Sequence, residues 1–253
     1  MKEKINILNL QFEPFLGDKD RNLKKVAKLL KENKDFNPDV VILPEVWNIG
    51  LAYDKFSDEA EFIPDQTTML LSGLAQENNT YIIAGSIIEK TFENQYFNTT
   101  LVFDRQGAFV GKYRKNHVFS HCGSEEAKYI NSGDDICIID IDGIKVGIAI
   151  CYDIRFPELF RKMLKMGAQI FVVPAAFAKE RIAQWNILNQ ARALENLAVL
   201  ISCNQFGSSN IVSPYGEILA SLPEGEGVLK YSLDTNIIIE ARKHTPFIED
   251  IKL

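Results

Sequence analysis

Three reactive side chains in this sequence each follow an apolar run that predicts a buried strand. They are Glu45 after VVILP (40–44), Lys115 after AFVGKYR (108–114) and Cys151 after KVGIAI (145–150). In open α/β sheets, sites lie beyond the carboxyl ends of strands, so these side chains could converge on one pocket. A thiol becomes a nucleophile when a base takes its proton, and a nearby ammonium stabilises an oxyanion. The set therefore indicates nucleophilic catalysis.

Cys151 has the surroundings expected of a nucleophile. Residues 152–158 indicate a sharp turn from a strand into a helix, which would lift the thiol out of the sheet as a nucleophile elbow does. Backbone N–H groups at the start of that helix could hold an oxyanion. The alternative is an inert core residue, because most buried cysteines act as small apolar side chains. On these features alone, the two interpretations are about equally supported.

The other three cysteines have structural interpretations. Cys203 and Cys137 lie in apolar strands and are predicted to be core residues, whereas Cys122 lies in a polar loop and is predicted to be exposed. The chain has four cysteines with no C-x-x-C pair and only three histidines, so a zinc site is not expected. A disulfide framework is not expected either, because the chain is large and shows no secretion signal.

Glu45 and Lys115 also have structural alternatives. Glu45 could be a surface-loop carboxylate, and Lys115 a solvated lysine on an edge strand. A papain-like cysteine–histidine pair is a further alternative for the chemistry. It is disfavoured because His117 and His121 lack the matching sequence context.

Composition restricts the class of protein. The chain has 253 residues, 46% of them hydrophobic and 25% charged, which is typical of one globular α/β domain with a large core. The net charge of −6 disfavours nucleic-acid binding, which requires clustered Lys and Arg. The N-terminus does not resemble a secretory signal, and no apolar run reaches about 18 residues. We expect a soluble cytoplasmic protein with no membrane partner.

The elements that must position these residues alternate along the chain. Strands are predicted at 5–12, 40–44, 81–88, 98–104, 108–114, 136–140, 145–151, 169–174, 198–204 and 227–233, with two short ones around Gly216. Helices are predicted at 18–33, 66–79, 157–167 and 181–197. Asp142-Gly143 is the strongest hairpin signal, and the tail after Ala241 is predicted to be irregular. Hairpins mixed with β-α units favour two sheets between helix layers.

Three segments together resemble the nitrilase superfamily, the carbon–nitrogen hydrolases. They are ILPEVW (42–47), GKYRKNHVF (111–119) and GIAICYDIRFPELFR (147–161), in the family's order of carboxylate, lysine and cysteine. The stretch 172–207 also resembles the family's later segment. Since the likeness covers almost the whole chain, residues 1–253 are expected to form a single carbon–nitrogen hydrolase domain.

The resemblance implies a four-layer α-β-β-α sandwich that assembles into a homodimer or a larger homo-oligomer. It implies Glu45 as general base, Lys115 as electrostatic stabiliser and Cys151 as nucleophile, with no metal or organic cofactor. Family members carry a second glutamate before a Gly-Asp turn. Glu126 stands at that spacing from Gly133, with Glu125 as its rival.

The residues that follow the cysteine indicate which branch of the superfamily the chain resembles. Branches that hydrolyse nitriles typically have Trp-Glu after the cysteine. This chain instead has YDIRFPE, which begins at Tyr152 and resembles the corresponding segment of omega-amidases and deaminated-glutathione amidases. Such an enzyme cleaves the amide of a short 2-oxo dicarboxylate to acid and ammonia through a thioester. Arg155 is then a candidate for binding the free carboxylate, and the backbone N–H of Tyr152 for holding the oxyanion. Phe177 and Trp185 are candidate pocket walls, with core packing as the alternative for each.

Three other functions stay open at this point. They are a nitrilase, an N-carbamoyl amidase and a non-catalytic small-molecule-binding homologue. Residues 207–216 also depart from the family pattern, since the segment is short and lacks the family's histidine. This departure concerns the rim of the pocket, and therefore the identity of the substrate.

Overall fold

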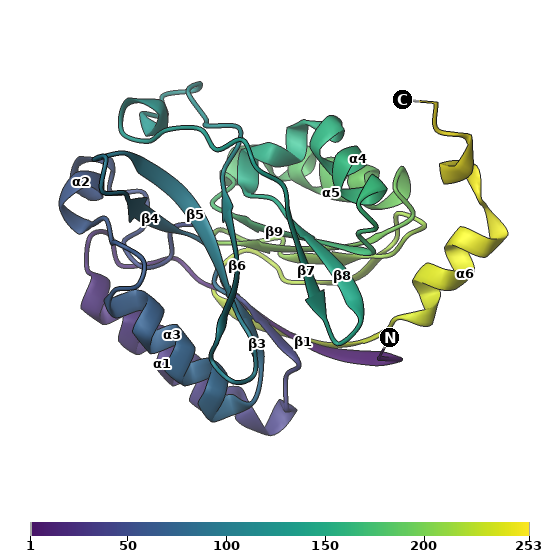
Figure 1. Cartoon of the computed structure of the whole chain (residues 1–253), viewed down its shortest axis with the longest axis horizontal. Helices are drawn as coiled ribbons and strands as arrows, with labels where there is room; N and C mark the ends of the chain where they lie inside the picture. Colours follow the sequence, from purple (N-terminus) through teal and green to yellow (C-terminus); the bar gives the residue numbers. More distant parts are fainter. Residues whose placement is uncertain (1, 253) are drawn as a thin grey trace.

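The computed structural model describes residues 2–252, and its polypeptide is arranged in four layers (Figure 1). Two β-sheets pack face to face in the middle. Helices α1 (Lys19–Asn33) and α3 (Gln66–Asn78) cover the outer face of one sheet, and α4 (Pro157–Lys165) and α5 (Ile182–Leu194) cover the other. The expected α-β-β-α sandwich is confirmed.

The first sheet has seven strands in the order β13-β1-β2-β3-β5-β4, with β6 paired to β5. Their bounds are β1 Lys4–Gln11, β2 Val40–Ile42, β3 Tyr81–Ile83, β4 Ile87–Lys90, β5 Tyr96–Phe103, β6 Phe109–Arg114 and β13 Gly227–Asp234. The strands β1, β2 and β3 run parallel, and the remaining pairs are antiparallel.

The second sheet has six strands in the order β12-β11-β10-β9-β8-β7. Their bounds are β7 Cys137–Ile141, β8 Ile144–Ile148, β9 Ile170–Ala175, β10 Val199–Asn204, β11 Asn210–Val212 and β12 Ile218–Ser221. Strands β8, β9 and β10 are parallel, and β7–β8 is the hairpin predicted from Asp142-Gly143. Both turn residues have positive φ, as a two-residue hairpin loop of this type requires.

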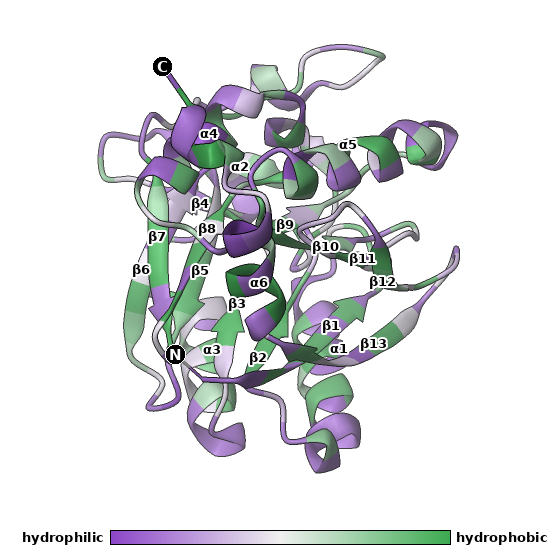
Figure 2. Cartoon of the chain, turned by 90° about the vertical axis from the view of Figure 1, so that its right-hand side faces the viewer, coloured by the Kyte–Doolittle hydropathy of each residue, from purple (hydrophilic) through white to green (hydrophobic). Residues whose placement is uncertain are grey.

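Amphipathic patterning holds the layers together. In α1, Leu23, Val26 and Leu30 are buried against the first sheet, and the Asp18 side chain caps the helix by accepting a hydrogen bond from the Arg21 N–H. Figure 2 shows hydrophobic residues concentrated in the strands, whereas α1 and α5 carry hydrophobic and hydrophilic residues in alternation. Burial of these apolar faces is the main stabilising contribution.

Two sequence predictions need correction. Residues 81–88 were expected to form one strand, but β3 and β4 are separated at Gly85, whose φ is +57°. The chain after Ala241 was expected to be irregular, but α6 spans Asn236–His244, with a short 3-10 turn at Phe247–Asp250. Short helical turns also occur at Lys34–Phe36, Tyr53–Lys55, Phe56–Glu59 (α2), Glu126–Lys128, Cys151–Arg155 and Lys179–Arg181. Within residues 2–252, no helix is long and apolar enough to cross a membrane.

Candidate active site

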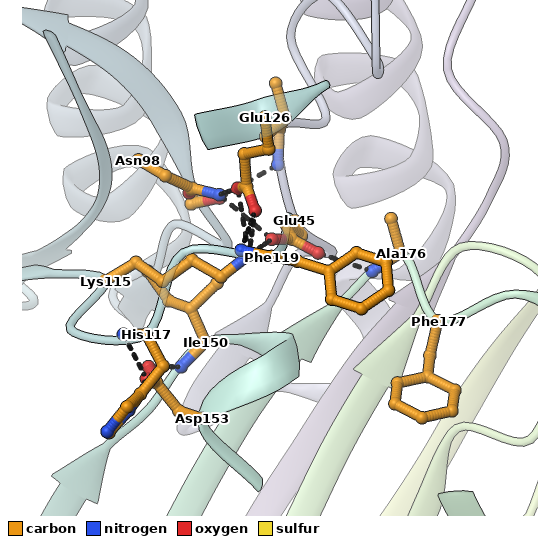
Figure 3. A network of polar contacts seen from close by, with 12 residues as sticks. Glu45, Asn98, Lys115, His117, Phe119, Glu126, Ile150, Asp153, Ala176 and Phe177 are labelled. Atoms are coloured by element: carbon orange, nitrogen blue, oxygen red, sulfur yellow. Dashed lines mark hydrogen bonds and ion pairs between the residues drawn. The ribbon is translucent and has the colours of Figure 1, made fainter. Parts of the chain in front are cut away.

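Glu45, Lys115 and Cys151 meet between the two sheets, where their strands end. The Lys115 Nζ donates to Glu45 Oε1 over 2.8 Å. The Cys151 thiol lies near both groups, since the charge of Glu45 raises its pKa and the charge of Lys115 lowers it. Figure 3 shows the contact between Glu45 and Lys115, which come from separate strand ends, and Cys151 lies within reach of their charges.

The carboxylate of Glu45 is fixed by three donors from different elements. Its Oε1 accepts from Lys115 and, over 2.9 Å, from Asn98 Nδ2 on β5. Its Oε2 accepts from the backbone N–H of Ala176, which follows β9 of the other sheet, over 2.8 Å. Glu45 is only 2% exposed, so these bonds replace those that water would make. These three bonds hold the carboxylate in one orientation.

Lys115 is a buried ammonium between two carboxylates. In addition to Glu45, its Nζ contacts Glu126 Oε1 and Oε2, each at 2.9 Å, and the side chain is 2% exposed. Burial alone would lower the pKa of Lys115, but the charges of Glu126 and Glu45 outweigh it and raise that pKa well above its ordinary value. Lys115 is therefore a permanently charged donor at neutral pH.

Glu126, unlike Glu125, lies buried beside Lys115. Glu126 is 3% exposed, and its carboxylate accepts from Lys115, from Asn98 Nδ2 over 3.0 Å and from the Phe119 N–H over 2.8 Å. Glu125 points to solvent, where it pairs with Lys128. The two glutamates therefore differ in burial, and only Glu126 contacts Lys115.

Cys151 sits at a strained point of the backbone. Its φ is +45°, a left-handed conformation that non-glycine residues adopt at a free-energy cost and that is concentrated at functional sites. It begins the short turn Cys151–Arg155, directly before α4. Burial, and next the charge of Glu45, raise the pKa of its thiol well above the ordinary value, while Lys115 opposes them. The resting side chain is therefore a neutral thiol.

A buried carboxylate, Asp153, ties the cysteine turn to the lysine loop. Its Oδ2 accepts from the Ile150 N–H (2.9 Å) and from the Tyr113 hydroxyl (2.7 Å). Its Oδ1 accepts from the His117 N–H over 2.9 Å and contacts His117 Nδ1 at 2.7 Å. Ile150 precedes the cysteine, and His117 lies two residues after Lys115. The network thus ties the turn that carries Cys151 to the segment that carries Lys115.

A cavity of about 230 Å³ opens onto Cys151. It is lined by Leu51, Tyr53, Phe119, Cys122, Gly123, Ser124, Cys151, Tyr152, Arg155, Ala176, Phe177, Ala178, Arg181 and Phe206. Its walls are mostly apolar and aromatic. Ligand sites for drug-sized molecules typically measure about 300–1,000 Å³, so this cavity suits a smaller molecule.

The predicted pocket residues divide into two groups. Tyr152, Arg155 and Phe177 line the cavity. Trp185 does not: it is fully buried behind Phe177, with ring centroids 4.8 Å apart, and its indole N–H donates to the Ser208 carbonyl. The prediction of Trp185 as a pocket wall is therefore corrected to core packing.

Several residues that build the site were not found from the sequence. They are Asn98, Phe119, Asp153, Ala176 and Arg181. The one available signal was polarity in an apolar context: Asn98 interrupts a buried strand, and an amide there requires partners. The cavity-lining position of the exposed Cys122 was missed as well.

Comparisons with known proteins agree with this geometry. A family model described as carbon-nitrogen hydrolase matches residues 9–243. A Xenopus laevis protein named omega-amidase NIT2-A is 34% identical over 97% of this chain and 93% of its own. A Bacillus subtilis protein named 2-oxoglutaramate amidase is 31% identical over 96% of each. The crystal structure of Saccharomyces cerevisiae Nit3, a nitrilase-superfamily member, superimposes with a TM-score of 0.87 at 28% identity, covering 97% and 96% of the two chains.

Proposed function

The chain belongs to the carbon–nitrogen hydrolase family and hydrolyses amides, and on that premise we propose that its substrate is the omega-amide of a short 2-oxo dicarboxylate. The observation that carries the proposal is a small, mostly apolar cavity that is lined by both Cys151 and a guanidinium, Arg155. A thiol beside a fixed carboxylate and ammonium suits attack on a carbonyl. The guanidinium suits the carboxylate at the substrate's other end.

The first half of the proposed reaction forms a thioester. Glu45 takes the proton of the Cys151 thiol as the sulfur attacks the amide carbon. The oxyanion is held by the Lys115 ammonium and the backbone N–H of Tyr152; loss of one such donor costs about 10²–10³ in rate. Glu45 returns the proton to the amide nitrogen, the C–N bond breaks and ammonia leaves.

The second half releases the acid. Glu45 takes a proton from water, whose oxygen attacks the thioester, and then returns that proton to the departing sulfur. Glu126 orients the water and also keeps the Lys115 ammonium in place. Its two contacts with Lys115 at 2.9 Å support this assignment. Every proton passes through one carboxylate, which explains why Glu45 needs a fixed orientation.

Ammonia release tests the substrate class. The panel contains 2-oxoglutaramate, 2-oxosuccinamate, deaminated glutathione, glutamine, a simple nitrile and an N-carbamoyl amino acid. We expect the wild type to release ammonia from a 2-oxo amide, and Cys151→Ala to release it at least about 10³-fold more slowly. Cys122→Ser, which removes the other thiol lining the cavity, is expected to retain the wild-type activity.

Other outcomes of the panel have definite meanings. Preference for the nitrile or the carbamoyl compound would replace the proposed substrate by that of another branch. Comparable turnover by Cys151→Ala would remove the nucleophile assignment.

We also propose that the protein is a cytoplasmic homodimer. Exposed apolar side chains at the end of α5, in the turn before β12 and at the start of β12 support self-association: Leu194, Tyr215 and Ile218 are each more than 40% exposed. Four unpaired cysteines suit a reducing compartment. Light scattering of the purified protein tests the assembly, and subcellular fractionation tests the location.

A further inference from the structure

The cavity has a second guanidinium, that of Arg181. Arg181 ends the turn Lys179–Arg181, directly before α5, and it lines the cavity together with Cys151 and Arg155. It is half-buried, so part of its donor set faces the cavity. The position places a permanent positive charge in the wall of the cavity.

The Arg181 guanidinium has aromatic neighbours but no anionic one. Its Cζ lies 5.6 Å from the ring centroid of Phe119 and 5.8 Å from that of Phe177. Among residues 2–252, its guanidinium makes no ion pair and no hydrogen bond. The adjacent Lys179, by contrast, pairs with both Glu13 and Glu224. The donors of Arg181 are therefore free to bind an anion.

Arg155 lies over one of the same aromatic rings, that of Phe177. Its Cζ is 5.4 Å from the Phe177 centroid, and one of its amino groups donates to Gln184 Oε1 over 2.8 Å. Both guanidiniums thus lie within 6 Å of one ring centroid. Arg155 has a neutral partner that orients it, whereas Arg181 keeps its whole donor fork.

The cavity offers these two cations no carboxylate of its own. Of the described residues that line it, none is Asp or Glu. The acidic side chains of the site, Glu45 and Glu126, lie deeper and are already bound to Lys115. A negative charge that neutralises the arginines must come from the ligand, and the apolar walls strengthen that attraction by excluding water.

We propose that Arg181 binds the carboxylate at the end of the substrate remote from the amide, with Arg155 as the second donor, and so selects omega-monoamides over neutral amides. This inference rests on the proposed amidase function and specifies its substrate class. A planar fork can donate two parallel hydrogen bonds to one carboxylate, which a lysine cannot do. The aromatic faces of Phe119 and Phe177 hold the fork in place.

A matched substrate pair tests the inference. Glutaramate carries a carboxylate at its remote end, and pentanamide carries a methyl group there. In Arg181→Met we expect kcat/KM for glutaramate to fall about 10–100-fold, the usual effect of losing a charge-assisted hydrogen bond, mainly through KM. For pentanamide we expect a change of less than about 3-fold. Lys179→Met, which removes a neighbouring charge, is expected to leave kcat/KM unchanged for both substrates.

The conservative variant and the double variant sharpen the test. Arg181→Lys restores the charge without the fork, so only part of the glutaramate activity is expected to return. If the two arginines share one carboxylate, the losses in Arg155→Met and Arg181→Met are non-additive in the double variant. If Arg181 had a purely structural role, Arg181→Met would lower kcat/KM equally for glutaramate and pentanamide. An unchanged ratio of the two kcat/KM values therefore overturns the inference.

Binding without turnover separates this inference from the proposed function. Calorimetry with glutarate uses Cys151→Ala and Cys151→Ala/Arg181→Met. A loss of affinity of about 10-fold or more in the second protein supports the arginine assignment even if the wild type hydrolyses no amide, in which case only the proposed function fails. Equal glutarate affinities overturn the assignment even if amides are hydrolysed.

Discussion

At the residue scale, the site is defined by three ionisable groups that control one another's protonation. Lys115 stays charged because Glu45 and Glu126 outweigh the cost of its burial. Cys151 stays neutral because its burial and the charge of Glu45 outweigh the attraction of Lys115. The thiolate is therefore expected to form only as Glu45 accepts the proton, at the moment of attack.

The protonation of Cys151 gives a direct prediction. Its pKa lies above the ordinary 9.0, so the difference in ultraviolet thiolate absorbance between the wild type and Cys151→Ala is expected to stay flat from about pH 7 to 9. Glu45→Gln removes a charge that raises this pKa, so its thiolate is expected to titrate at lower pH than in the wild type, with turnover lost. A wild-type thiolate that titrates below about pH 8 would contradict the account.

Prediction from sequence succeeded where a side chain had a distinctive local context. Cys151 had a strand-to-helix turn, and Glu45 and Lys115 had strand ends, so their meeting could be anticipated. Asp153 could not, because its partners, Tyr113 and His117, lie about 40 residues away in sequence. A carboxylate after a cysteine has no local mark that distinguishes a buried acceptor from an exposed one.

At the element scale, two glycines let the chain pass close to the site. A Cβ at Gly85 would lie 1.9 Å from the Pro44 carbonyl oxygen, one residue before Glu45. A Cβ at Gly133 would lie 2.5 Å from the carbonyl oxygen of Arg114, one residue before Lys115. Both contacts are with backbone, which cannot rotate away. Close approach to the segments that carry the carboxylate and the ammonium therefore requires residues without a side chain.

Gly85→Ala tests this interpretation. Gly85 has φ +57°, so alanine adds left-handed strain to the collision with Pro44, and we expect the free energy of unfolding to fall by about 3 kcal/mol. Activity should fall further than the unfolded fraction explains, because Glu45 moves. The matched control is Gly73→Ala on exposed α3, where nothing lies within 4 Å and stability should rise by about 0.5–1 kcal/mol. Denaturant unfolding measures the stability of both variants. Equal changes in the free energy of unfolding would contradict the close-approach explanation.

Most elements could be predicted from periodicity, and the errors have physical causes. The run 81–88 is largely apolar, so only Gly85 and Ser86 marked the break between β3 and β4. In α6, only Ile238 and Ala241 are buried, so the apolar stripe that identifies a helix is short. Both errors concern places where tertiary contacts, and not local pattern, determine the backbone.

At the scale of the whole molecule, the site exists only because the two sheets pack in one register. Glu45 and Lys115 extend from strands of the first sheet, whereas Cys151 and Ala176 extend from the second. Contacts deep in the interface fix that register: the Asn9 side chain on β1 donates to the Ser202 carbonyl on β10 over 2.7 Å. Such pairings between distant segments could not be inferred from one sequence, although the four-layer architecture could.

The central claim is that this assembled site cleaves amides through a thioester on Cys151. The most direct measurement is the intact mass of enzyme quenched in acid during turnover of 2-oxoglutaramate, followed by peptide mapping. The account predicts a mass increase equal to the substrate less ammonia, located on the Cys151 peptide and absent in Cys151→Ala. Turnover by Cys151→Ala, or an adduct located on another residue, would contradict it.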